Sequence, residues 1–354
     1  MSIKKINIFT SLVLSCAMLM CSCSNGGTDN TSSQSESETS VSSSDESDIS
    51  SVNIFADSSS AEENTTPSDM TPAMWKVTAE DGTTMTLLGS MHAVKDSDYP
   101  LPTQIMDAYN SADVLAVECD TTDFENDINA KYALMSQMKY SDGTKLKDVI
   151  SKDAYKGVLH MAKEYGLQEN QIADMKPWAV QNTIDGMSTV GTDIKSSNAI
   201  DGYFLKLAHE KNKEIYQVES VQSQFDMLMN FSTDIYNMIF EGYNSQTKES
   251  NAKSNEELYQ AWRKGDLKTL EKMSTEAESV DGSEIPESEM AVYDDYTDQM
   301  LYSRNIVMEK AVKKLLKEKK NVFYVVGAAH YVGDKGIISL LEKDGYKVER
   351  LDYK

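Results

Sequence analysis

The feature that most constrains the fold is an apolar run ending in Gly-x-x-His, which occurs twice in the chain. The copies are residues 85–92, MTLLGSMH, and residues 322–330, VFYVVGAAH. Each is typical of a buried strand, a turn at glycine and a histidine just past the strand's carboxyl end. In open α/β sheets ligands bind outside those carboxyl ends. Two histidines in equivalent positions, far apart in the sequence, therefore predict one composite site.

The segments between these copies indicate a mixed α/β fold. A hairpin is predicted at 75–78 and 83–88, and further strands at 114–117, 214–218, 322–326 and 346–351. Helices are predicted at 100–111, 199–211, 257–273, 290–317 and 337–343, and most of 122–265 is helical in character. We therefore predict a mixed sheet with a large helical insertion.

Polar side chains stand after four of the predicted strands: His92, Glu118, Glu219 and His330. If those strands are parallel neighbours, the four side chains meet at one edge of the sheet. A carboxylate at the end of an apolar strand is costly unless it is paired or binds a metal. Two histidines and a carboxylate are a common ligand set for a divalent metal, and they leave positions for water and substrate. The chemistry predicted is hydrolysis.

Each of these residues also has a structural interpretation. A single histidine after a strand is often only a packed polar residue, and Glu118 could form a salt bridge with Arg304 or a lysine. Arg304, if it faces the site, would bind a substrate carboxylate or stabilise an oxyanion, and otherwise it is a surface arginine. His160 and His209 are predicted to be ordinary helical residues, partly buried and exposed respectively.

The N-terminal residues predict export and lipidation. Two lysines precede a short apolar stretch, which is typical of a secretory signal and too short for a confident transmembrane helix. Cys16, Cys21 and Cys23 cluster at its end, as in the lipobox of bacterial lipoproteins. We assign residues 1–23 to a lipoprotein signal peptide and Cys23 to lipidation, with Cys16 as the second choice. An ordinary cleaved signal is the alternative.

The next segment, 24–72, is predicted to be a disordered tether. It is rich in serine and acidic residues, with 10 Asp or Glu and no Lys or Arg. Such a sequence buries too little apolar surface to offset its ordering entropy. The domain that follows, 73–354, contains one cysteine, Cys119, so no disulfide can form within it. The whole chain has a net charge of −23, which excludes nucleic acid as an expected partner.

These residues resemble the TraB/PrgY/GumN family, also called Tiki-like, over about 75–354. The resemblance rests on both Gly-x-x-His copies, on the strand ending in Glu118, and on a series of smaller steps in family order. Those steps are Lys176-Pro177-Trp178, Asp201, Glu219 with Gln224, Gly265-Asp266 and Arg304-Asn305.

The resemblance implies a mixed α/β fold shared with erythromycin-esterase-like and ChaN-like proteins. It also implies the metalloprotease chemistry of the animal Tiki members. Carried over by residue, it gives His92, Glu118 and His330 as metal ligands for Mn, Co or Zn, with Glu118 alternatively the general base. Arg304 and Asn305 become catalytic contacts, and Glu219 and Gln224 substrate-binding residues.

The sequence as a whole therefore predicts a lipid-anchored, metal-dependent hydrolase on the extracytoplasmic face of the cell membrane. Its expected substrate is a secreted peptide or a protein segment. The alternatives are a non-catalytic surface lipoprotein that binds a peptide or haem, and a degenerate domain used only for interactions.

Overall fold

The computed structural model describes residues 6–7, 66–279 and 284–354. The predicted signal peptide, apart from residues 6–7, and the predicted tether, apart from residues 66–72, lie outside these residues, so both assignments stay predictions. Of the helices in the described part, none combines the length and the apolar character needed to cross a membrane.

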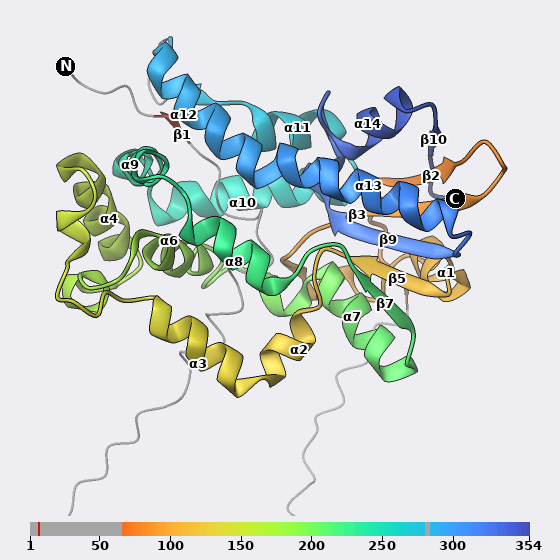
Figure 1. Ribbon diagram of the computed structural model, residues 1–354, viewed down its shortest axis with the longest axis horizontal. Coiled ribbons are helices and arrows are strands. Elements are labelled where there is room, and N and C mark those ends of the chain that lie inside the picture. Colours follow the sequence, from red (N-terminus) through yellow and green to blue (C-terminus); the bar gives the residue numbers. More distant parts are fainter. Residues whose placement is uncertain (1–5, 8–65, 280–283) are drawn as a thin grey trace, which may run out of the picture.

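A six-stranded mixed sheet organises the domain (Figure 1). Its strand order is β10-β2-β3-β9-β5-β7. The bounds of these strands are β2 Met74–Thr78, β3 Thr84–Ser90, β5 Val114–Val117, β7 Glu214–Gln217, β9 Val322–Gly327 and β10 Lys347–Arg350. Strands β2 and β3 form an antiparallel hairpin, and β10 pairs antiparallel with β2. Strands β3, β9, β5 and β7 run parallel to one another. The predicted mixed α/β fold is confirmed.

Helices cover both faces of this sheet, because successive strand residues are apolar on both sides. Leu115 and Phe323 pack on one face, and Ala116 and Tyr324 pack on the other. The helices of the first face are α1 Thr103–Ser111, α7 Ile200–Lys211 and α10 Lys248–Arg263. Those of the second face are α13 Ser303–Lys317 and α14 Ile337–Lys343. In Figure 1, α13 and α14 lie toward the top of the view together with β2 and β10, and α7 lies toward the bottom near β7.

The predicted helical insertion is a separate layer of short helices with its own hydrophobic cluster. It lies to the left of the sheet in Figure 1. Its helices are α2 Thr121–Asn126, α3 Ile128–Gln137, α4 Lys152–Glu164, α5 Glu169–Ile172, α6 Pro177–Gly186, α8 Val221–Met229, α9 Thr233–Gly242 and α12 Glu287–Thr297. Cys119 and Ala329, next to two of the predicted site residues, contact this cluster, so the insertion borders the site.

Two long helices expected from the sequence are interrupted. The 257–273 segment divides into α10 and α11 (Leu267–Thr275), because Gly265 adopts a φ of +61°. A Cβ at that position would lie 2.7 Å from the backbone oxygen of Thr71, so only glycine fits. The 290–317 segment contains a π-helical turn, η6 (Asp298–Tyr302), between α12 and α13. Such π turns are frequent near functional sites.

Short elements complete the fold and were not predicted. Two small antiparallel pairs are present, β4 Val94–Lys95 with β6 Ile194–Lys195, and β1 Ile6–Asn7 with β8 Glu278–Ser279. The 3-10 turns are η2 Asp96–Asp98, η3 Leu146–Asp148, η4 Ser196–Asn198, η5 Tyr243–Ser245 and η7 Ala328–Tyr331. The turn η7 matters most, because it directly follows β9 and contains His330.

Candidate functional site

Both histidines of the repeated motif lie at the same edge of the sheet. Strands β3 and β9 are parallel neighbours, with Ser90 paired to Gly327 in register. His92 lies two residues after Ser90, and His330 lies three residues after Gly327. Both side chains are buried, 4% and 1% exposed. The predicted convergence of the two motifs is therefore what the fold produces.

A neighbouring acceptor fixes each imidazole through its Nδ1 atom. His92 Nδ1 lies 3.0 Å from Oδ1 of Asp201 on α7, and His330 Nδ1 lies 2.6 Å from Oδ1 of Asn305 on α13. The Asn305 amide nitrogen donates to the Lys335 carbonyl, which leaves its oxygen to accept from the histidine. Both rings therefore carry Nδ1–H, and in the neutral form of each ring Nε2 is unprotonated. This is the arrangement of metal-binding histidines, whose second nitrogen donates to an outer partner.

Both Nε2 atoms are buried and have no hydrogen-bond partner among the described residues. An orphaned buried polar atom in a native protein costs roughly 1–3 kcal/mol and calls for a ligand, ion or water. Two such atoms from equivalent positions of neighbouring strands indicate one bound group.

The carboxylate of Glu118, at the end of β5, divides its two oxygens between different partners. Oε1 accepts a hydrogen bond of 2.8 Å from the Gly327 N–H and lies 3.7 Å from Nε2 of His330. Oε2 accepts bonds from Arg304 at 2.6 Å and from Gln224 at 3.2 Å. One oxygen thus faces the histidines, and the other faces away from them into a polar network.

Gly327 marks the space that these groups surround. A Cβ built on Gly327 would lie 3.2 Å from Glu118 Oε1, 3.5 Å from His92 Nε2 and 3.5 Å from His330 Cδ2. The φ of this glycine is −52°, which any residue adopts, so its backbone does not require glycine. What favours glycine is the space itself, which is bounded by two imidazoles and a carboxylate, because a Cβ there would press on Glu118 Oε1.

Arg304 on α13 is held between two acidic side chains. It donates to Glu118, to both oxygens of Glu219 at 2.9 and 3.2 Å, and to the Met300 carbonyl at 3.0 Å. Gln224 on α8 donates to Glu118 and, at 3.0 Å, to Glu219. The structure thus places Arg304, Glu219 and Gln224 in one network behind Glu118. The substrate contacts predicted for Glu219 and Gln224, and the catalytic contacts predicted for Arg304 and Asn305, stay predictions.

The electrostatics of the site separate its ionisable groups. Burial acts to raise the pKa of Glu118, but the charge of Arg304, the largest opposing cause, lowers it to about 2. Burial, aided by the Arg304 charge, lowers the pKa of His330 to about 3. Burial also acts to lower the pKa of His92, but the Asp201 carboxylate raises it above its ordinary value. Glu118 is thus an anion beside a neutral His330 at neutral pH.

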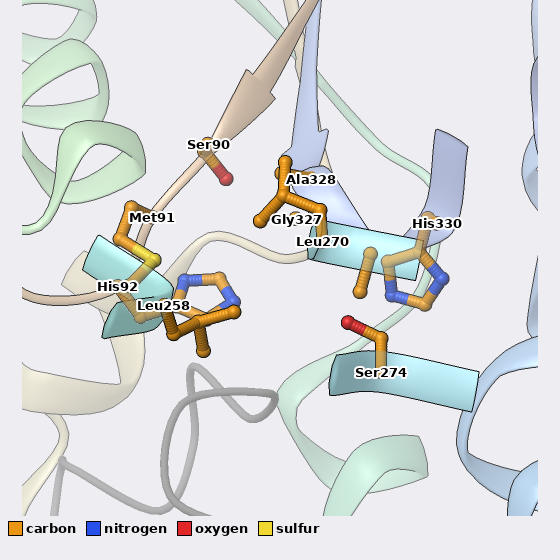
Figure 2. Close-up of a pocket in the computed structure, with 10 residues that line it drawn as sticks. Ser90, Met91, His92, Leu258, Leu270, Ser274, Gly327, Ala328 and His330 are labelled. Atoms are coloured by element: carbon orange, nitrogen blue, oxygen red, sulfur yellow. The ribbon is translucent and has the colours of Figure 1, made fainter. Parts of the chain in front are cut away.

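A small cavity of about 30 Å³ opens between the two imidazoles (Figure 2). Its lining residues are Ser90, Met91, His92, Leu258, Leu270, Ser274, Gly327, Ala328, Ala329 and His330. A cavity of this size holds a water molecule or an ion. Leu258 and Leu270, from α10 and α11, form an apolar wall that shields the imidazoles from solvent.

Some residues of the site were not singled out from the residue pattern. Asp201 entered only as a match to the family, although an Asp in the first turn of a helix is a candidate imidazole partner. The hydroxyls of Ser90 and Ser274 had no sequence signal, because single serines are common.

A second group of metal-binding type begins two residues after Glu118. Asp120, Asp123 and His209 bring their ligand atoms within 4.8 Å of one another. His209 is exposed, as predicted, but its Nε2 lies 2.7 Å from Asp120 Oδ2, an ion pair that was not predicted. Asp120 also accepts the Thr122 N–H as the N-cap of α2, so a structural role already accounts for its carboxylate.

We predict that Gly327→Ala closes the space between Glu118 and the histidines. The backbone accepts alanine, so the melting temperature should change little. The added methyl would displace Glu118 Oε1, so titration calorimetry with Zn²⁺ or Mn²⁺ should detect no binding at this site. Binding equal to that of the parent would show that the space over Gly327 holds no metal.

Comparisons with known proteins show several that are similar in sequence to parts of this chain. The human metalloprotease TIKI1 is 27% identical over 178 residues, which are 46% of this chain and 35% of the relative. The metalloprotease TIKI homolog of Amphimedon queenslandica is 40% identical over 55 residues, 15% of this chain and 11% of the relative. The uncharacterized protein YbaP of Escherichia coli K12 is 22% identical over 143 residues, 40% and 51% respectively.

The aligned part of the chain spans about half or less of each of these relatives. No solved structure gave a significant match. The profile of the TraB/PrgY/gumN family, in contrast, matches residues 73–350, which include the whole sheet and every residue of the site. The chain therefore belongs to the TraB/PrgY/gumN family.

Proposed function

We propose that this protein is a metal-dependent peptidase, anchored by a lipid to the extracytoplasmic face of the cell membrane. The observation that carries the proposal is the convergence of two unpartnered imidazole nitrogens and one carboxylate oxygen on the space over Gly327. The related proteins named metalloproteases support the reaction class.

His92 and His330 through Nε2, and Glu118 through Oε1, would hold a divalent ion, Mn²⁺, Co²⁺ or Zn²⁺. The donor set fits such an ion, because both imidazoles have their Nδ1 atoms already bonded and both Nε2 atoms are orphaned. When bound, the ion supplies Lewis-acid activation of water and of a peptide carbonyl.

The remaining residues of the site position these groups. Asp201 and Asn305 hold the imidazole tautomers, and a misplaced ring would cost much of the affinity. Arg304 and Gln224 hold one oxygen of Glu118, so that the other is turned toward the histidines. Leu258 and Leu270 limit the access of water. In this arrangement Glu118 acts as a ligand, and the general-base role is the alternative.

The proposed location rests on the sequence alone. The basic start, the short apolar stretch and the cysteines at its end are those of a lipoprotein signal, and an acidic segment without Lys or Arg follows. An anchored domain on a flexible tether can reach secreted peptides or exposed protein segments near the membrane. These are the substrates that we propose.

We expect His330→Ala to lower the affinity for Mn²⁺ or Zn²⁺ by about 100-fold or more, because loss of an outer-shell partner alone costs about 10- to 100-fold. The measurement is titration calorimetry on the purified, metal-stripped full chain. His209→Ala is the matched control, since His209 belongs to the Asp120 group and not to this site. A loss of affinity in His209→Ala, with His330→Ala unchanged, would move the metal to the Asp120 group.

We expect the metal-loaded parent to cleave members of a random peptide library, detected by mass spectrometry, and to lose this activity when a chelator removes the metal. Glu118→Gln should lower both the rate and the metal affinity if Glu118 is a ligand. A lower rate with unchanged affinity would instead identify the general base. Peptide retained without any cleavage product would favour the peptide-binding alternative, and a Soret band on adding haem would favour the haem-binding one.

Cells that express the protein and are labelled with a fatty-acid analogue should incorporate the label into the parent chain. Cys23→Ala should abolish the label and release the protein from the membrane fraction, because one covalent lipid is its proposed anchor. Cys16→Ala is the control, because it leaves Cys23 in place and should keep the label. Label retained in Cys23→Ala and lost in Cys16→Ala would assign the lipid to the other cysteine.

A further inference from the structure

The helix α11 brings a hydroxyl to the cavity between the two imidazoles. Leu267, Leu270 and Ser274 fall on one face of this helix, at the i, i+3 and i+7 positions. The face packs toward the sheet, with Leu270 only 2% exposed, and α11 contacts η7, which contains His330. The helical pattern of apolar residues on this face predicts an apolar side chain at position 274, but the chain has serine there.

The Ser274 hydroxyl is directed into the cavity. Ser274 lines it together with His92 and His330. Figure 2 shows its oxygen pointing toward the space between the two imidazole rings, from the side opposite β3 and β9. The leucines that share this wall, Leu258 and Leu270, have no polar atoms in their side chains.

The other polar groups that face this space are acceptors. In the neutral rings the two Nε2 atoms carry lone pairs, and Glu118 offers a carboxylate oxygen. Arg304, the nearest cation, donates through each of its three nitrogens to Glu118, Glu219 and Met300. Among the side chains that line the cavity, the free donors are therefore the hydroxyls of Ser90 and Ser274.

The two serines differ in access. Ser90 is 2% exposed, and its Oγ is buried without a partner at the sheet side of the cavity. Ser274 is half-buried and stands on the helix that covers the cavity. A substrate that enters past α11 would meet Ser274 first. Peptide hydrolysis develops negative charge on the carbonyl oxygen, and a positioned donor stabilises that charge.

We infer that the Ser274 hydroxyl donates a hydrogen bond to the carbonyl oxygen of the peptide bond that is cleaved. This inference rests on the proposed function and assigns to the site a substrate contact supplied by α11. Ser274 is not a metal ligand in this assignment, so its removal should affect the rate and leave metal binding intact.

The test compares Ser274→Ala and Ser274→Thr with the full-length parent. The substrate is the library peptide that the metal-loaded parent cleaves fastest. Ser274→Ala should lower kcat by about 100-fold, the usual cost of one such donor, with little change in KM. Ser274→Thr keeps the hydroxyl and should retain most of the rate. Calorimetry with Zn²⁺ or Mn²⁺ alone should give the parent affinity for both variants.

Thr275→Ala is the matched control. Thr275 is the next residue on the helix, and its hydroxyl donates at 2.8 Å to the Glu271 carbonyl of the same helix. Its removal should leave kcat unchanged. An equal loss of rate in Thr275→Ala would mean that any change in α11 disturbs the site, and would overturn the inference.

Two further outcomes separate this inference from the proposed function. Cleavage by Ser274→Ala at the parent rate, or a fall in its metal affinity, would overturn the Ser274 contact and leave the peptidase standing. A parent that binds metal but cleaves no peptide would overturn both.

Discussion

The carboxylate of Glu118 is the group on which the site depends. It is buried at the end of a central strand, where an isolated charge would be strongly unfavourable. Three donors compensate it: the Gly327 N–H, Arg304 and Gln224. Removing one partner of such a buried pair typically costs about 3–5 kcal/mol. Strands β5 and β9, helix α13 and helix α8 are therefore held in register around one side chain.

This constraint also explains why glycine follows β9. Parallel pairing of β3, β9 and β5 places the ends of these strands side by side, so that the turn after β9 lies between His92 and Glu118. Any side chain at 327 would occupy the space into which the three groups point. The glycine of the second motif thus provides room, and its N–H binds the carboxylate. The glycine of the first motif is packed against Ala328, 3.0 Å from the Cβ position, which fixes η7 against β3.

The helices around the sheet supply what the sheet alone lacks. Asp201 and Asn305 come from helices on opposite faces of the sheet, and each fixes one imidazole. Gln224 and Leu258 come from helices far from the strands in the sequence, and they complete the network and the apolar wall. The geometry of the two Gly-x-x-His motifs therefore depends on residues distributed over most of the domain.

The sequence by itself determined the strands of the six-stranded sheet, their polar ends and the convergence of His92, Glu118 and His330. Those inferences follow from hydrophobic periodicity and from the rule that parallel strands end at a common edge, both of which are local or topological. It did not determine the partners of those residues. The Asp201 and Asn305 contacts, the Arg304–Glu219 network and the Ser274 hydroxyl depend on how helices dock. How helices dock is decided by packing between segments that are distant in the chain, so no short sequence motif predicts it.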